Sequence, residues 1–253
     1  MGQAFVSLGR IQEILDEPVE KMDEQGLKPQ IKGEIEFNDV YFEYEDGKPV
    51  LEGVSFNIKK GQTVAILGST GSGKSSLVHL LLRFYDYKKG TIKIDGIELK
   101  NIDKRWLREK IGIVLQEPFL FSKTIKDNIR LGKWDVEDED IFRASSMVAI
   151  HDTIQRFERG YDTLIGERGV TLSGGQRQRL AIARTIIRDV PVLIFDDSLS
   201  AVDVETDAAI RKALKEKSKD ITTIIISHRI TTLAEADLIL VLENGKITQK
   251  NPQ

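Results

Sequence analysis

The 253-residue sequence contains no cysteine, which excludes disulfides, thiolate metal sites and a cysteine nucleophile. It has no apolar run long enough to span a bilayer, and its first residues, Met1 to Gln3, do not open a secretion signal. Neither sign of charge dominates, because the sequence has 37 basic and 40 acidic residues and a formal charge of −3. No overall field therefore attracts nucleic acid or an anionic membrane, and partners must be recognised locally. A membrane role is expected to come through another polypeptide or segment.

What the sequence does contain is a glycine-rich loop between an apolar strand expected at residues 63–67 and a leucine-rich helix. The loop matches the pattern G-x-x-x-x-G-K-[ST] in full and consists of Gly68, Ser69, Thr70, Gly71, Ser72, Gly73, Lys74 and Ser75, followed by Ser76. Glycines leave the backbone N–H groups free to surround phosphates, and the start of the helix adds a positive field. Lys74 is expected to contact the β- and γ-phosphates, and Ser75 to bind Mg²⁺. An ordinary glycine turn is the alternative, but it does not require the whole pattern.

Three further apolar strands are each followed by polar side chains. Residues 190–195 lead into Asp196 and Asp197, residues 111–115 lead into Gln116, and residues 221–227 lead into His228. The carboxyl ends of parallel strands meet at one edge of a sheet, where ligands bind. Asp196 is therefore expected to hold the Mg²⁺ of a nucleotide. A structural role remains open for the others: Gln116 as a strand cap, Asp197 as a helix N-cap and His228 as an ordinary structural histidine.

A second glycine-rich loop, Leu172-Ser173-Gly174-Gly175-Gln176, opens a helix expected at 177–187. Such a loop at a helix N-terminus again suits an anion, although a serine cap is common on structural grounds alone. Tyr44 ends an expected strand and precedes a turn. Its ring could pack at a sheet edge or face a purine base, and the residue by itself does not decide between the two.

The remaining segments outline an α/β protein. Residues 5–17 have apolar side chains at helical spacing, and the charged residues 18–33 read as a linker. A helix is expected over 104–110, and residues 124–160 are mostly helical in pattern. Short strands are expected at 33–37, 40–44 and 50–58, with hairpins at 91–99 and 238–248.

The order of these motifs resembles the nucleotide-binding domain of ABC transporters over about residues 34–250. Leu172 to Gln176 match the signature of that family, and they lie between the phosphate loop and the strand that ends in Asp196. The resemblance implies an α/β fold: a P-loop NTPase core with a mostly parallel sheet, an antiparallel β-subdomain and an α-helical signature subdomain at about 117–180. It also implies that residues 1–33 are a connector helix and linker from a transmembrane domain, and that residues 34–253 form the ABC domain.

The resemblance also implies functional roles. It makes Tyr44 the aromatic residue that stacks on the base, Gln116 a contact of Mg²⁺ and of the transmembrane domains, and His228 a residue near the γ-phosphate. Ser200 and Asp203 fall in the D-loop, and the Glu167 region resembles a segment that contacts the coupling helices of exporters. ATP and Mg²⁺ are the implied cofactors. The resemblance further implies that two such domains pack head to tail at the cytoplasmic face of a membrane, so that the signature of one acts on the ATP of the other.

One position departs from the family pattern. After the Mg²⁺ aspartate, the family usually has a glutamate that polarises the attacking water, and this chain has Asp197. Loss of one methylene withdraws the carboxylate by roughly 1.5 Å, and a misplacement near 1 Å can lower a rate about a hundredfold. Slow hydrolysis at the chain's own phosphate loop is expected, with ATP binding retained. The chain thus resembles the degenerate-site half of a heterodimeric exporter; the alternative is a homodimer in which Asp197, assisted by His228, is a slower base.

Other classes of ATP- or GTP-binding protein fit the sequence less well. Chromosome-maintenance ATPases share the signature, but they insert long coiled coils, and residues 76–171 contain no sustained heptads. Translation-type members carry tandem domains, whereas only one set of motifs is present. Asn101-Ile102-Asp103-Lys104 is not the guanine-reading pattern of GTPases. A non-hydrolysing structural subunit remains a further alternative.

Overall fold

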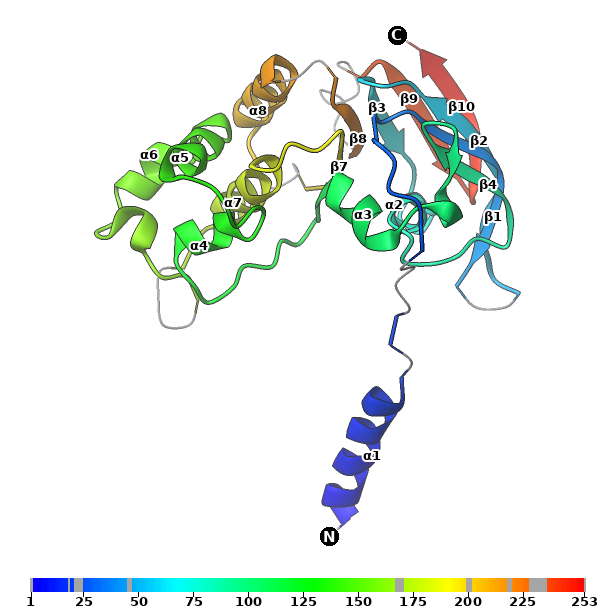
Figure 1. Cartoon of the computed structure of the whole chain (residues 1–253), viewed down its shortest axis with the longest axis horizontal. Coiled ribbons are helices and arrows are strands. Elements are labelled where there is room, and N and C mark those ends of the chain that lie inside the picture. The colour runs from blue at the N-terminus through cyan, green and yellow to red at the C-terminus, as the bar shows by residue number, and fades with distance from the viewer. Residues whose placement is uncertain are drawn as a thin grey trace.

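The computed structural model describes residues 2–17, 19–20, 25–44, 47–166, 171–198, 202–217, 220–227 and 236–252. The first helix, α1 (Gly2–Asp16), extends away from the rest of the molecule (Figure 1). Leu8, Ile11, Ile14 and Leu15 are exposed on it. This confirms the helix expected over residues 5–17.

A six-stranded sheet forms the centre of the molecule, in the order β10-β9-β3-β8-β7-β6. Its strands are β3 (Thr63–Leu67), β6 (Ile111–Val114), β7 (Val192–Asp196), β8 (Thr222–Ile226), β9 (Leu238–Glu243) and β10 (Lys246–Pro252). All neighbouring pairs run parallel except β9 and β10, which form the expected antiparallel hairpin. β7 is buried until its last residue, because its apolar side chains are covered on both faces. The mostly parallel core expected from the sequence is confirmed.

A second, antiparallel sheet of four strands has the order β2-β1-β4-β5. Its strands are β1 (Ile35–Glu43), β2 (Pro49–Ile58), β4 (Lys89–Ile94) and β5 (Ile97–Glu98). The two short strands expected before residue 45 are a single strand, β1, whose pairing with β2 shifts register between Phe37 and Val40. Asp95 and Gly96 form the expected hairpin turn with positive φ angles of 50° and 77°.

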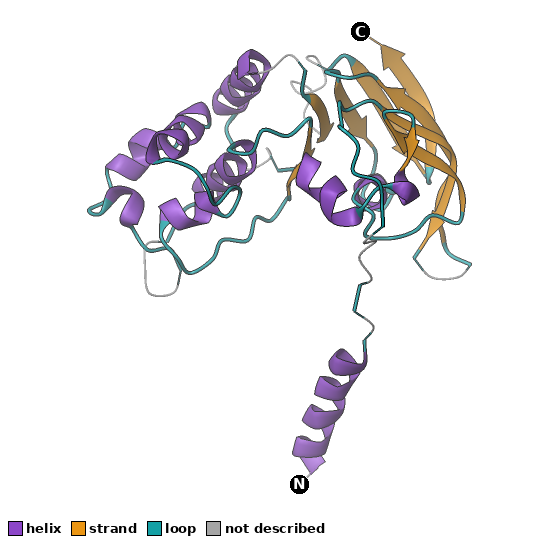
Figure 2. Cartoon of the chain, viewed as in Figure 1, coloured by secondary structure: helices purple, strands orange, loops and turns teal. Residues whose placement is uncertain are grey.

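The helices divide between two regions. α2 (Lys74–Leu81) and α3 (Lys104–Lys110) lie beside the sheets, whereas α4 (Ile125–Arg130), α5 (Asp138–Met147), α6 (His151–Gln155), α7 (Gly174–Ile186) and α8 (Val204–Lys217) gather in a separate helical lobe (Figures 1 and 2). Single 3-10 turns occur at Leu99–Asn101 and Gly160–Asp162.

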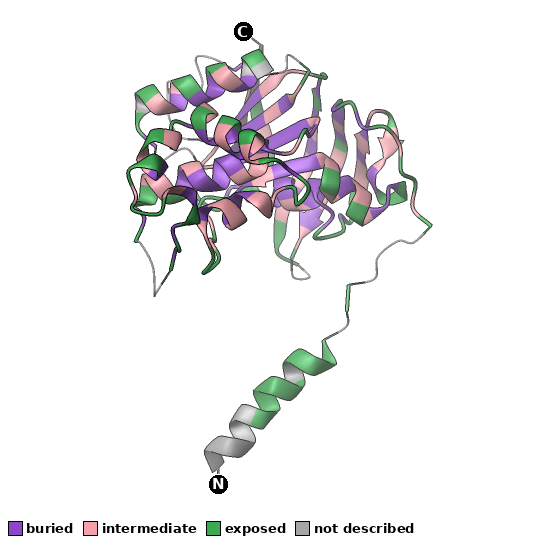
Figure 3. Ribbon diagram, turned by 60° about the vertical axis from the view of Figure 1, so that its left-hand side comes forward, coloured by how far each residue is buried: buried purple, intermediate pink, exposed green. Residues whose placement is uncertain are grey.

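Each region has its own buried core (Figure 3). One cluster joins the two sheets to α2 through residues such as Ile35, Ile66 and Leu80. The other packs the helical lobe against the central sheet through residues such as Leu180 and Phe195. Because β6, β7 and β8 lie between the two clusters, the loops after these strands emerge where the regions meet.

Candidate nucleotide-binding site

The phosphate loop joins β3 to α2, and two of its glycines are required by close packing. A Cβ on Gly68 would lie 2.2 Å from the Leu242 carbonyl oxygen, and one on Gly73 would lie 2.7 Å from Leu51 Cδ2. Gly73 caps α2 with a φ of 104°, which favours glycine. A Cβ on Gly71 would meet no atom within 4 Å, so the loop is open at that point. The space beside Gly71 suits a phosphate group.

Lys74 supplies the positive charge of this loop. Its Nζ donates hydrogen bonds to the Gly68 and Ser69 carbonyl oxygens, both at 2.8 Å. Burial lowers the pKa of Lys74, and the carboxylates of Asp196 and Asp197 oppose that effect. Ser72 adds a buried hydroxyl that has no hydrogen-bond partner among the described residues. The loop therefore presents a cation and an unsatisfied polar group where phosphates are expected to bind.

The predicted Mg²⁺ ligands Ser75 and Asp196 lie together. Ser75 Oγ donates to Asp196 Oδ1 at 3.5 Å, which joins the start of α2 to the end of β7. Burial raises the pKa of Asp196, while the hydrogen bond from Ser75 acts in the opposite direction. A hydroxyl and a single carboxylate are the hard oxygen ligands that Mg²⁺ takes beside nucleotide phosphates and water. Within the described ranges no cluster of three His, Asp or Glu side chains could hold a metal. The donors present therefore fit Mg²⁺ carried by a nucleotide.

Asp197 and Gln116 meet at the same edge of the sheet. Gln116 Nε2 donates to Asp197 Oδ2 at 3.4 Å. Asp197 has a φ of 46°, and its N–H donates to the Ile226 carbonyl oxygen at 2.9 Å. Aspartate tolerates this left-handed conformation better than most residues. The ends of β6, β7 and β8 are thus brought together, while His228, predicted beside them, lies outside the described residues.

Tyr44 lies beside α2, within reach of the phosphate loop. Its hydroxyl is 3.0 Å from Ser76 Oγ and 3.1 Å from His79 Nδ1. The rings of Phe42 and Tyr85 contact it at interplanar angles of 79° and 90°. The sequence reasoning missed His79. Its spacing of three residues from Ser76, which places both on one side of α2, is the signal that could have identified it.

The signature loop caps α7. Ser173 Oγ accepts from the Gln176 N–H at 3.3 Å, and Gln176 Oε1 accepts from the Ser173 N–H at 2.9 Å, which completes a capping box. Leu172 anchors the loop by burial, and a Cβ on Gly174 would meet no atom within 4 Å. α7 belongs to the helical lobe and α2 to the sheet region (Figure 1). The two glycine-rich loops therefore cap helices in different regions.

The remaining predicted residues divide between described and undescribed positions. Asp203 Oδ1 accepts from the Thr206 N–H at 2.9 Å, and this bonding to Thr206 lowers the pKa of Asp203. Asp203 also lies 3.9 Å from Arg179 of α7. Ser200 and Glu167 lie outside the described residues.

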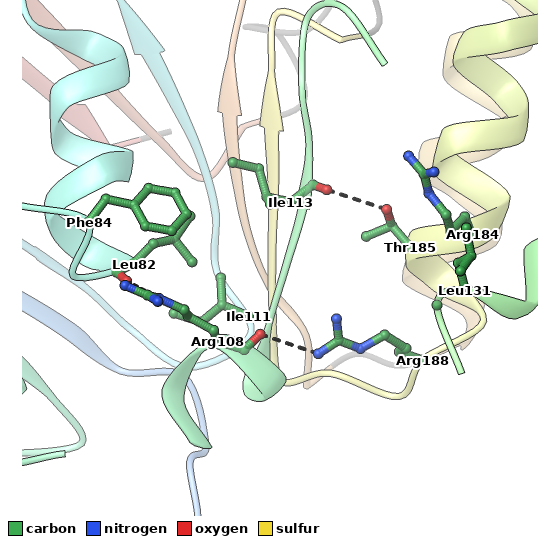
Figure 4. Close-up of a pocket in the computed structure, with 10 residues that line it drawn as sticks. Leu82, Phe84, Arg108, Ile111, Ile113, Leu131, Arg184, Thr185 and Arg188 are labelled. Carbon is green, nitrogen blue, oxygen red and sulfur yellow. Dashed lines mark hydrogen bonds between the residues drawn. The ribbon is translucent and has the colours of Figure 1, made fainter. Parts of the chain in front are cut away.

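A pocket of about 240 Å³ lies between the sheet region and the helical lobe (Figure 4). Arg108 of α3, Arg184 of α7 and Arg188 line it together with apolar side chains: Leu82, Phe84, Ile111, Ile113 and Leu131. Arg184 Nη1 donates to the Phe119 carbonyl oxygen at 2.9 Å, which ties the pocket to the loop after β6. Burial lowers the pKa of both Arg184 and Arg188. The sequence gives no local signal for this pocket, because its walls come from segments that lie far apart in the chain.

Comparison with known proteins identifies the family. The ABC transporter family matches residues 51–200. The candidate multidrug export ATP-binding/permease protein YgaD of Bacillus subtilis is 44% identical over 250 residues, which is 98% of this chain and 43% of that protein. The β-(1→2)glucan export ATP-binding/permease protein NdvA of Bartonella bacilliformis is 45% identical over 222 residues, 88% of this chain and 37% of its own length. The chain thus spans less than half the length of these relatives.

A solved structure is also similar. A bacterial Atm1-family ABC exporter with ATP bound superimposes with a TM-score of 0.89 at 36% identity, covering 99% of this chain and 44% of the exporter chain. Among the described helices of this protein, none combines the length and apolarity needed to cross a bilayer. The phosphate loop, the signature loop and these matches all indicate the same family. The chain belongs to the ABC transporter family, in which it is the ATPase domain.

Proposed function

We propose that this chain powers the export of a substrate across a membrane by binding and hydrolysing ATP at the cytoplasmic face. One observation carries the proposal: the two glycine-rich loops cap helices in different regions, as two halves of a shared site would require. The relatives named for export join an ATP-binding part to a permease part in one protein. Residues 1–33 would then connect to the permease part, and residues 34–253 would form the ABC domain, with its helical subdomain at about 117–180.

ATP would bind along the phosphate loop and α2. Residues 68–76 would surround the phosphates, with Lys74 as the cation that neutralises them. Ser75, Asp196 and Gln116 would hold Mg²⁺, which supplies charge neutralisation of the phosphates when bound. Tyr44 would present its ring to the base; 46% of its surface is exposed although its hydroxyl is held.

Two such domains would pack head to tail. Residues 172–176 would then complete the site on the partner, because a helix N-terminus with open glycines suits the γ-phosphate of a second ATP. Gly174 has no atom within 4 Å of its Cβ position, which leaves that approach open. Ser200 and Asp203 would lie at the same interface.

Asp197 would make the chain's own site slow. A shortened carboxylate stands farther from the attacking water, and general-base catalysis is sensitive to such displacement. We favour a heterodimer in which the partner holds the faster site and this chain supplies the intact signature. A homodimer in which Asp197 and His228 act together is the alternative.

The transmembrane part would contact this chain through Gln116 and the Glu167 region, and also at the pocket between the two regions. Three arginines and several apolar side chains favour a short helical segment that carries both apolar and acidic residues. The hydrogen bond from Arg184 to the Phe119 carbonyl oxygen links this surface to the loop that follows Gln116. In the full-length protein, Leu131→Asp is expected to reduce transport, whereas the ATP affinity of the isolated chain should stay the same.

The test of this function is steady-state ATP hydrolysis by the purified chain and by Asp197→Glu at several protein concentrations, with ATP binding measured for both. If both bind ATP and only the glutamate variant hydrolyses it, with a rate that rises faster than linearly with protein, the degenerate half-site is supported. Comparable turnover by the unmodified chain would instead favour the homodimer. Absence of ATP binding would refute the proposed function.

A further inference from the structure

The hydroxyl of Tyr44 is held by two partners on one side of α2. Ser76 Oγ lies 3.0 Å from it, and His79 Nδ1 lies 3.1 Å from it. A phenol has one hydrogen to donate and can accept as well, so it can satisfy both partners at once. The three side chains form a short chain of hydrogen bonds that starts next to the phosphate loop.

We infer that His79 is a positioning residue for the nucleotide base: its imidazole holds the Tyr44 hydroxyl and thereby fixes the ring on which the base is expected to stack. The inference rests on the proposed role of Tyr44 as the base contact. It adds a residue that the phosphate-loop pattern does not contain, because His79 lies beyond Ser76, the last residue assigned to that loop.

The surroundings of Tyr44 explain why such a restraint is needed. Tyr44 follows the last residue of β1, and 46% of its surface is exposed. The rings of Phe42 and Tyr85 contact it at centroid distances of 4.7 and 4.9 Å, which limits the ring from two sides. Among the described residues, Ser76 and His79 on α2 restrain the far end of the ring through its hydroxyl. A base that stacks on an exposed tyrosine binds more tightly when the ring is already held in place.

His79 is itself fixed. Its carbonyl oxygen accepts from the Phe84 N–H at 2.9 Å near the end of α2, and its ring lies 6.0 Å from the rings of both Phe84 and Tyr85. The imidazole is half-buried and belongs to α2, the helix whose N-terminus completes the phosphate loop. The helix that positions the phosphates, α2, therefore also positions Tyr44.

The experiment compares two ligands that differ in the base. The dissociation constants of ATP and of inorganic tripolyphosphate, each with Mg²⁺, are measured by calorimetry for the 253-residue chain and its variants. His79→Leu removes the hydrogen bond and keeps a good helix former. We expect it to weaken ATP binding by roughly 3- to 10-fold, the size of one hydrogen bond, with tripolyphosphate binding unchanged. His79→Asn restores a polar group near Nδ1 and should return ATP binding to within about twofold.

The chain offers a matched control. His151 Nδ1 lies 2.8 Å from the Tyr161 hydroxyl, the same type of pair, in the helical lobe. His151→Leu should change neither dissociation constant. Tyr44→Ala serves as the positive control, because loss of the ring should weaken ATP binding and leave tripolyphosphate binding unaffected.

The outcomes separate this inference from the proposed function. If Tyr44→Ala lowers the preference for ATP over tripolyphosphate and His79→Leu does not, the role of His79 is refuted and the base contact stands. An equal loss of both ligands in His79→Leu, without rescue by asparagine, would mean that His79 only supports α2, and would also refute the inference. If Tyr44→Ala leaves the preference unchanged, both the base contact and the role of His79 are wrong.

Discussion

The side-chain amide of Gln116 donates a hydrogen bond to the carboxylate of Asp197 across 3.4 Å, between residues 81 positions apart in the chain. The contact joins the loop after β6 to the end of β7. It gives the loop that we propose as a transmembrane contact a direct connection to the carboxylate that we propose as the weak base.

This contact predicts that the two residues act together. In the Asp197→Glu background, Gln116→Ala should lower hydrolysis more than it does in the unmodified chain, because the longer carboxylate depends on the amide for its position. Coupled residues of this kind typically differ from additivity by about 0.5–3 kcal/mol. The four rates, at saturating ATP and equal protein concentration, form the double-mutant cycle, and the two slow chains that keep Asp197 are followed over long incubations. Purely additive effects would show that the contact has no part in catalysis.

The loop glycines predict a difference in stability. A Cβ on Gly68 would lie 2.2 Å from a backbone oxygen of β9, whereas one on Gly71 would meet nothing within 4 Å. Gly71→Ala should cost only the strain of its φ of 82°, about 1 kcal/mol. Gly68→Ala should cost at least about 2 kcal/mol more, because the backbone must move. Urea unfolding without nucleotide measures both, and equal losses would contradict the packing argument.

How far the sequence predicts this site depends on whether its residues are neighbours in the chain. The phosphate loop and the signature are local patterns, since the glycines, the capping serine and the helix that follows occur within a few residues. The strand ends that carry Asp196 and Gln116 follow from a general rule about parallel sheets. These parts could be predicted because they require no knowledge of the packing.

The parts that could not be predicted join distant segments. His79 contacts Tyr44 from 35 positions away, and no pattern along the chain pairs them. Arg108, Arg184 and Arg188 read as surface charges until α3 and α7 are placed beside β6. The left-handed conformation of Asp197 depends on its hydrogen bond to Ile226 in the neighbouring strand. Each of these depends on how segments that are distant in the chain pack together.

An ion pair between the linker and the core predicts a dependence of stability on pH. Arg108 donates to both oxygens of Glu20, at 2.7 and 2.9 Å, and this bonding lowers the pKa of Glu20 from 4.5 to about 2. A lowered carboxyl pKa contributes stability above the unfolded value, and that contribution is lost as the pH falls toward about 2. Because Glu20 is 42% exposed, solvent screening keeps the contribution below about 1 kcal/mol.

Glu20→Gln should therefore lower the free energy of unfolding at pH 7, and the difference from the unmodified chain should shrink below pH 4.5. Urea unfolding at pH 7 and at pH 3.5 measures it, and 1 M salt should reduce the pH 7 difference. Glu17→Gln, an exposed neighbour, is the control. The same difference at both pH values would show that the pair contributes by packing rather than by charge.

The separation of the two glycine-rich loops predicts complementation between inactive chains. In a head-to-tail pair, Lys74→Ala inactivates the site on its own phosphate loop, and Ser173→Arg inactivates the site on its partner. Both variants are made in the Asp197→Glu background, in which hydrolysis is expected to be faster, and each variant alone should be inactive. A mixture of the two should recover activity, because one of the two sites in the mixed pair joins an intact phosphate loop to an intact signature. Ser173 also caps α7. Ser173→Ala removes this cap, which should lower the stability by about 1 kcal/mol, and it is therefore the control for folding. Failure to recover activity in the mixture, with both variants folded and Ser173→Arg still binding ATP, would mean that the signature does not act across the pair.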